Sequence, residues 1–175
     1  MQYRLFMPKQ AVGANLVYFD AFNASGSPFT LQLLSVMPVV SGAVAVVGTL
    51  GVDLFLTRTS AIGTGGTAAT VEGTSLTAAT FTCTDGSQPI NNGVITARLT
   101  PTGGATAGAV ISFDSVFTEE TNAGTYTPAI DLVTPQTDGA SPIVIPPGTG
   151  FRVVQGSVAS VGNIGFNIVF ALIQK

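Results

Sequence analysis

The amino-acid sequence predicts an all-β protein, folded as an antiparallel two-sheet sandwich of the jelly-roll type with an N-terminal arm. The first observation is that apolar and polar residues alternate with a period of two, whereas no long stretch combines a helical period with capping residues. The second is that turn residues separate about nine or ten such segments, at the 8–12-residue spacing of sandwiches and barrels. The third is composition, since 46% of the residues are hydrophobic and only 9% are charged, against about 25% charged in an ordinary domain.

The strands are expected in chain order wherever alternation is bounded by turn residues. Residues 1–10 are amphipathic and end near Pro8, so we expect an N-terminal arm or an edge strand there, followed by one sandwich domain over residues 11–175. The small-residue segment 61–74 and the polar segment 119–138 are expected to be loops, each with a short strand, the second near residues 130–133. The other strands before the C-terminal region are expected over residues 15–22, 29–37, 43–47, 52–59, 76–84, 94–100 and 110–118.

The C-terminal region carries the clearest strand signals. Pro146-Pro147-Gly148 predicts a chain reversal between strands at residues 143–145 and 151–155, because proline fixes φ and glycine accepts positive φ. The last strand is expected to lie inside a sheet, because its second face is also small or apolar. Its first face carries large apolar residues at every second position: Ile164, Phe166, Ile168, Phe170 and Leu172.

Composition also excludes several classes of function. A net charge of −3, with six basic residues spread along the chain, argues against nucleic-acid binding. Histidine is absent and Cys83 is the single cysteine, so neither an intrachain disulfide nor a multi-cysteine metal site is expected, and no cofactor is implied. The uncharged run 36–52 contains Pro, Ser, Gly and many valines, so paired strands fit it better than a membrane span. No secretory signal is visible, which predicts synthesis and folding in the cytoplasm.

Each candidate catalytic motif lacks a residue or a geometry that its chemistry requires, so the protein is not expected to be an enzyme. The glycine-rich stretches 63–69 and 102–108 lack the lysine and the following helix of a phosphate-binding loop, and both are interpreted as turns. Neighbouring residues on a strand point to opposite faces, so Glu119 and Glu120 are not expected to converge as a glycosidase pair. Cys83 has no histidine to activate it and is interpreted as a small packed side chain.

The C-terminal pattern resembles a known group of proteins. Residues 142–156 read PIVIPPGTGFRVVQG and the closing strand reads NIGFNIVFA over residues 163–171, which resembles small structural proteins of tailed bacteriophages; the TGGAT stretch at 102–106 is similar too. The resemblance implies a virion structural protein made in the host cytoplasm, expected to be a capsid decoration (cement) protein. It implies a homotrimer whose partner is the major capsid protein, and it transfers no functional residue.

Low charge and high hydrophobicity are typical of large protein interfaces, so we expect intersubunit contacts through residues 1–9 and 36–52. Two other hypotheses stay open. A receptor- or glycan-binding module of a phage fibre or tail would use a polar cluster near residues 122–126. A hydrolase would need Asp114 to converge with Glu119 or Glu120. The candidate interface residues are Tyr3, Leu5, Phe6, Val39, Val40, Val44, Val46 and Val47.

Overall fold

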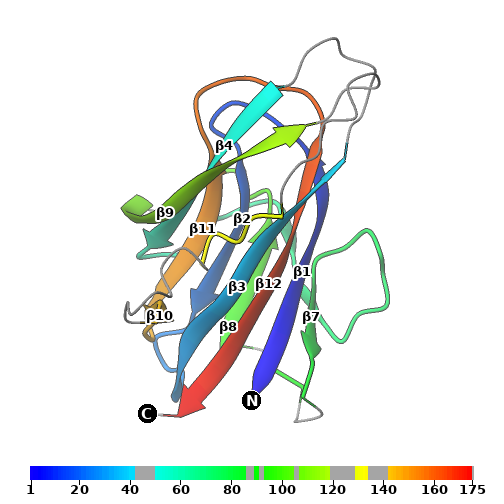
Figure 1. The fold of residues 1–175 in the computed structure, drawn as a ribbon. Helices are drawn as coiled ribbons and strands as arrows, with labels where there is room; N and C mark the ends of the chain where they lie inside the picture. The colour runs from blue at the N-terminus through cyan, green and yellow to red at the C-terminus, as the bar shows by residue number, and fades with distance from the viewer. Residues whose placement is uncertain are drawn as a thin grey trace.

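The protein is a sandwich of two six-stranded sheets packed face to face (Figure 1). The structure, a computed structural model, describes residues 1–41, 50–85, 89–90, 93–104, 107–118, 129–133 and 142–174. The strands within these ranges are β1 (Gln2–Ala11), β2 (Val17–Asn23), β3 (Phe29–Ser41), β4 (Leu50–Thr59), β5 (Thr67–Ala68), β6 (Thr70–Val71), β7 (Thr80–Cys83), β8 (Ile95–Leu99), β9 (Ala107–Thr118), β10 (Val144–Ile145), β11 (Thr149–Gln155) and β12 (Asn163–Gln174). The described ranges contain no helix, and so none long and apolar enough to cross a membrane.

The strand order confirms the all-β sandwich and has the pattern of a jelly roll. Sheet A has the order β10-β3-β12-β1-β7-β6, and sheet B has the order β5-β8-β2-β11-β4-β9. Four antiparallel pairs are nested along the chain: β1 with β12, β2 with β11, β3 with the two-residue β10, and β4 with β9. Successive pairs alternate between the two sheets. The chain is therefore one long hairpin rolled into a sandwich, which is the topology of a jelly roll.

The connection between β4 and β9 carries the four additional strands. β7 extends sheet A beyond β1, and β8 extends sheet B beyond β2. β1 consequently pairs on both sides, with β12 and with β7 (Figure 1). The expectation of an N-terminal arm or edge strand over residues 1–10 is wrong for residues 3–6, because these residues pair with β12 on one side and with β7 on the other.

Two short strands were also expected, at residues 130–133 and at residues 43–47. Residues 130–133 form no strand, because the carboxylate of Asp131 takes the place of a backbone acceptor: it accepts the N–H groups of Val36 and Val133, each at 2.9 Å. The N–H of Leu132 donates to the carbonyl of Val36 at 3.0 Å, so this segment lies along the side of β3 that faces away from β12. The strand expected over residues 43–47 lies outside the described residues.

The core lies between the sheets and is built by one face of each long strand. All five large residues predicted for one face of the last strand are buried, with exposed fractions between 0% and 7%. Aromatic rings connect the two layers: Phe19 of sheet B lies 5.3 Å from Phe166 of sheet A, centroid to centroid, and 5.9 Å from Phe151. Such edge-to-face pairs add about 0.5–1.5 kcal/mol beyond the area they bury.

Candidate functional site

The outer face of sheet A is hollow at Gly165 on β12. Its neighbour across the sheet on one side is Val39 of β3. On the other side the register of β1 shifts between Met7 and Gln10, a segment that includes Pro8, which has no N–H to donate. A Cβ atom at Gly165 would lie only 2.7 Å from the carbonyl oxygen of Met7. The close approach of the two backbones therefore requires glycine, and the sheet lacks a side chain at this point.

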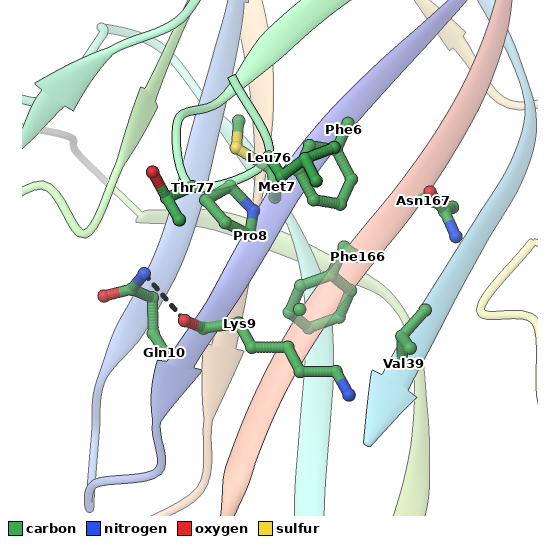
Figure 2. Close-up of a pocket in the computed structure, with 11 residues that line it drawn as sticks. Phe6, Met7, Pro8, Lys9, Gln10, Val39, Leu76, Thr77, Phe166 and Asn167 are labelled. Carbon is green, nitrogen blue, oxygen red and sulfur yellow. Dashed lines mark hydrogen bonds between the residues drawn. The ribbon is translucent and has the colours of Figure 1, made fainter. Parts of the chain in front are cut away.

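A groove of about 520 Å³ occupies this hollow (Figure 2). Its lining residues are Phe6, Met7, Pro8, Lys9, Gln10, Val39, Leu76, Thr77, Gly165, Phe166 and Asn167. Leu76 is 86% exposed, and Figure 2 shows it close to Phe6 at one end of the groove, with Val39 and the Lys9 amine toward the other. Lys9 is the one charged residue among the described residues that line the groove. The groove is thus an apolar depression with a cation at its rim.

The structure separates the predicted interface residues of β1 into two faces. Tyr3 and Leu5 are 2% and 0% exposed, and the Tyr3 ring stacks on Phe170 at 5.8 Å. Their side chains belong to the core, so the prediction that Tyr3 and Leu5 contact another subunit is wrong. The period of two points residues 3 and 5 inward and Phe6 outward, where Phe6 lines the groove.

The predicted residues of the 36–52 segment fall into three groups. Val39 is 38% exposed and lines the groove. Val40 is half-buried against the core. Val44, Val46 and Val47 lie outside the described residues. Of the predicted set, the structure therefore brings Phe6 and Val39 to one surface depression.

Sequence reasoning missed three contributors to this surface. Leu76 was placed at the start of a strand, but β7 begins only at Thr80 and Leu76 lies in the irregular segment before it. Met37 is 39% exposed and pairs in register with Asn167, so it extends the apolar surface along β3. Gly165 shapes the groove by lacking a side chain. A glycine within an alternating strand was the available signal for a close backbone approach.

The outer face of sheet B carries a second apolar patch on β9. Phe113 is 65% exposed and its ring stacks on Phe55 of β4 with a centroid distance of 5.7 Å. Phe117 and Val110, on the same strand, are 39% and 57% exposed. Clustered exposed apolar side chains of this kind are typical of interaction surfaces.

The candidate catalytic and metal-binding residues do not assemble into a site within the described ranges. Asp114 accepts the N–H of the neighbouring Ser115 at 2.7 Å, while Glu119 and Glu120 lie outside the described residues, as do residues 122–126. The thiol of Cys83 is half-buried and donates to Asp85 at 3.4 Å. No group of three or more His, Cys, Asp or Glu side chains able to hold a metal occurs in the part of the chain that the structure describes.

Fold and surface together define the class of this molecule: a jelly-roll sandwich that exposes apolar side chains on the outer faces of both sheets. Comparisons with models of known protein families, with curated proteins and with solved structures found no match to this chain. Its function must therefore be argued from the site itself.

Proposed function

We propose that this protein is a structural protein of a virion, and specifically a capsid decoration (cement) protein that binds the phage head through apolar contacts. The observation that carries the proposal is the apolar groove on sheet A, walled by Phe6, Val39 and Leu76. A sheet in an antiparallel sandwich commonly presents a polar face to water. Exposed apolar surface on such a face is typical of a protein interaction site.

The fold is compatible with this proposal without deciding it. Jelly rolls occur in viral capsid proteins, and also in lectins and cupins. The resemblance of residues 142–156 and 163–171 to small phage structural proteins favours the first of these classes. We accordingly propose the major capsid protein and further copies of the chain, as a homotrimer, as its partners.

The groove supports a specific mode of attachment. An apolar side chain of a neighbouring subunit would enter the groove between its Phe6–Leu76 end and Val39, and a carboxylate beside that side chain would pair with Lys9 at the rim. Because Gly165 keeps the floor of the groove open on two rigid strands, no rearrangement of the sheet is required for binding.

Two measurements test the proposal. Quantitative mass spectrometry of purified particles should detect the chain at a fixed ratio to the major capsid protein. Light scattering of the purified protein should give a trimer mass that does not change with concentration. Absence of the chain from purified particles would overturn the virion assignment, and a stable monomer would overturn the trimer.

A further inference from the structure

A short segment, residues 67–71, connects the two sheets on the side where β8 and β7 lie, and we call it the strap. Its first part is β5, which pairs with residues 98–99 of β8. The N–H of Ala69 then donates to the carbonyl of Ala97 at 2.9 Å, whereas the N–H of the next residue, Thr70, donates to the carbonyl of Ala79 at 3.0 Å. The strap therefore leaves sheet B after Ala69 and joins sheet A as β6, beside β7.

The departure of the strap leaves one side of β8 without a strand partner at Ile95. Successive residues of an antiparallel strand direct their N–H and carbonyl groups to opposite sides. Ala24 donates its N–H to the carbonyl of Val94, and Thr100 donates its N–H to the carbonyl of Tyr18, both at 2.9 Å, so the even-numbered residues bond to β2. The N–H and carbonyl of Ile95 consequently point away from β2. Within the described residues, no strand pairs with Ile95 on that side.

A pocket of about 280 Å³ opens at this place, lined by residues of β8 and of the strap, with Phe81 of β7 on the opposite sheet. Phe81, Ile95 and Ala97 are buried core residues, so the inner end of the pocket reaches the space between the sheets. Gly93 and Thr96 are exposed and mark its mouth. The pocket thus leads from the surface beside β8 to the core.

Small residues create the space in this pocket. Ala68, Ala69, Ala97 and Gly93 all line it, and none of them carries more than a methyl group. Its volume of about 280 Å³ lies just below the roughly 300–1,000 Å³ of pockets that hold a whole drug-sized ligand. It exceeds the roughly 150 Å³ at which an apolar cavity already binds benzene. The pocket is therefore suited to one apolar side chain.

The charged group in the lining is engaged by the chain itself. Arg98 is the one charged residue among the described residues that line the pocket, and its Nη1 donates to the carbonyl of Gly65 at 3.0 Å. Arg98 also lies directly across from Asp20 of β2, which is fully buried and accepts the N–H of Gly63. We therefore assign ligand recognition to the backbone of Ile95 and the apolar walls, and not to this charge.

The backbone of Ile95 requires a partner that both donates and accepts hydrogen bonds. Ile95 is only 3% exposed, and buried backbone N–H and carbonyl groups are nearly always paired. An extended peptide presents both groups at the spacing of a strand. When such a peptide adds to a free sheet edge, the main-chain bonds supply affinity and a pocket for alternate side chains supplies specificity.

We propose that the free edge of β8 binds an extended peptide segment by strand addition, with one apolar side chain of the peptide in the pocket beside the strap. The segment would lie opposite residues 93–96, on the line that β5 leaves after Ala69, and would exchange hydrogen bonds with Ile95. Gly93 presents no side chain against it. The inference does not rest on the virion assignment, and this pocket shares no lining residue with the groove on sheet A.

The test is a titration of the ¹⁵N-labelled full chain, followed by amide chemical shifts. The probes are a blocked tripeptide with leucine at its centre, the same tripeptide with glycine at its centre, and toluene. We expect saturable shifts of amides in residues 67–71 and 93–98 with the leucine peptide, and binding about tenfold weaker or less with the other two probes. Saturation with the leucine peptide should also slow hydrogen exchange of the Ile95 amide about tenfold or more, because that N–H gains an acceptor.

Variants connect the binding to the pocket. Ala69→Leu fills the pocket from the strap and should weaken binding of the leucine peptide about tenfold or more. The matched control is Ala78→Leu, because Ala78 is half-buried like Ala69 but does not line the pocket, and it should leave the affinity unchanged. Val71→Ala enlarges the pocket and should strengthen binding of a tripeptide with phenylalanine at its centre. The same spectra report whether each variant is folded.

Several results would overturn the proposal. These are absence of shifts with the leucine peptide, equal binding of the glycine peptide, and unchanged affinity in a folded Ala69→Leu variant. Equal binding of toluene, or unchanged hydrogen exchange of the Ile95 amide, would show a pocket for apolar molecules without strand addition and would overturn it too.

Discussion

The apolar groove on sheet A and a hollow between loops beside sheet B are built in different ways. The groove lies on regular strands and exists because Gly165 removes one side chain from a continuous face. A second hollow, the loop pocket of about 570 Å³, lies between the loops at residues 13–17 and 100–104, in which Asn15 and Thr100 have left-handed φ values of 59° and 45°. One surface is an apolar depression on a sheet face, whereas the other is a hollow bounded by loop backbone. The same sandwich core therefore carries two hollows that are built by different means, one by regular strands and one by loops.

The largest effect on stability is expected for a substitution of Gly165, because the groove exists where this residue has no side chain. Gly165→Val places atoms within contact of the Met7 carbonyl and of the Lys9 N–H, 2.7 and 3.0 Å from the new Cβ. We expect the free energy of unfolding to fall by about 1–3 kcal/mol or more, the range typical of overpacking. Denaturant unfolding measures the change. Gly26→Ala, where no atom lies within 4 Å of an added Cβ, is the control and should change stability far less.

The loop pocket predicts opposite signs for two neighbouring threonines. Thr100→Gly relieves the left-handed strain of about 1–2 kcal/mol, which exceeds the entropic cost of glycine, about 0.5–1 kcal/mol. Stability should therefore rise by up to about 1 kcal/mol. Thr102→Gly, in the same loop but without a positive φ, should lower it. Thermal unfolding measures both changes. Equal losses of stability in the two variants would contradict a strain energy of about 1–2 kcal/mol at Thr100.

Some features of this fold could be predicted from the sequence, and others could not. Alternation correctly identified the buried face of the last strand, because a period of two is a local signal. It could not tell which face of β1 points inward, so Tyr3 and Leu5 were assigned to an interface although they belong to the core. Whether β1 lies at an edge depends on pairing with β12 and β7, which are distant in sequence. The loop pocket was beyond reach for the same reason, since three separate segments form it.

A smaller, pH-dependent effect is expected at Asp20. Because burial raises its pKa, the folded chain binds the proton more tightly than the unfolded chain does. Its contribution to stability is therefore full below the ordinary aspartate pKa of about 4 and is lost as the pH rises through the higher folded value. Asp20→Asn keeps an oxygen that can accept the Gly63 N–H and removes this dependence. The stability of the variant relative to the natural chain should rise with pH across that window, and parallel stability curves would contradict the raised pKa.

The smallest effect on stability, within about 0.5 kcal/mol, is expected for Leu76→Asp, since this side chain is 86% exposed. The substitution nevertheless places a charge on the apolar wall of the groove. Val158→Asp is the matched control, because Val158 is 67% exposed and is absent from the groove lining. Denaturant unfolding of both variants should give midpoints close to that of the unchanged protein.

The most direct test of the proposal that this is a capsid decoration protein is to measure, by co-sedimentation, how these two variants and the unchanged chain bind to phage heads that lack the protein. If the groove is the attachment surface, Leu76→Asp should weaken binding about tenfold or more, the cost of losing one central interface contact, and Val158→Asp should bind normally. Equal binding of both variants and the unchanged chain would show that the groove is not the attachment surface.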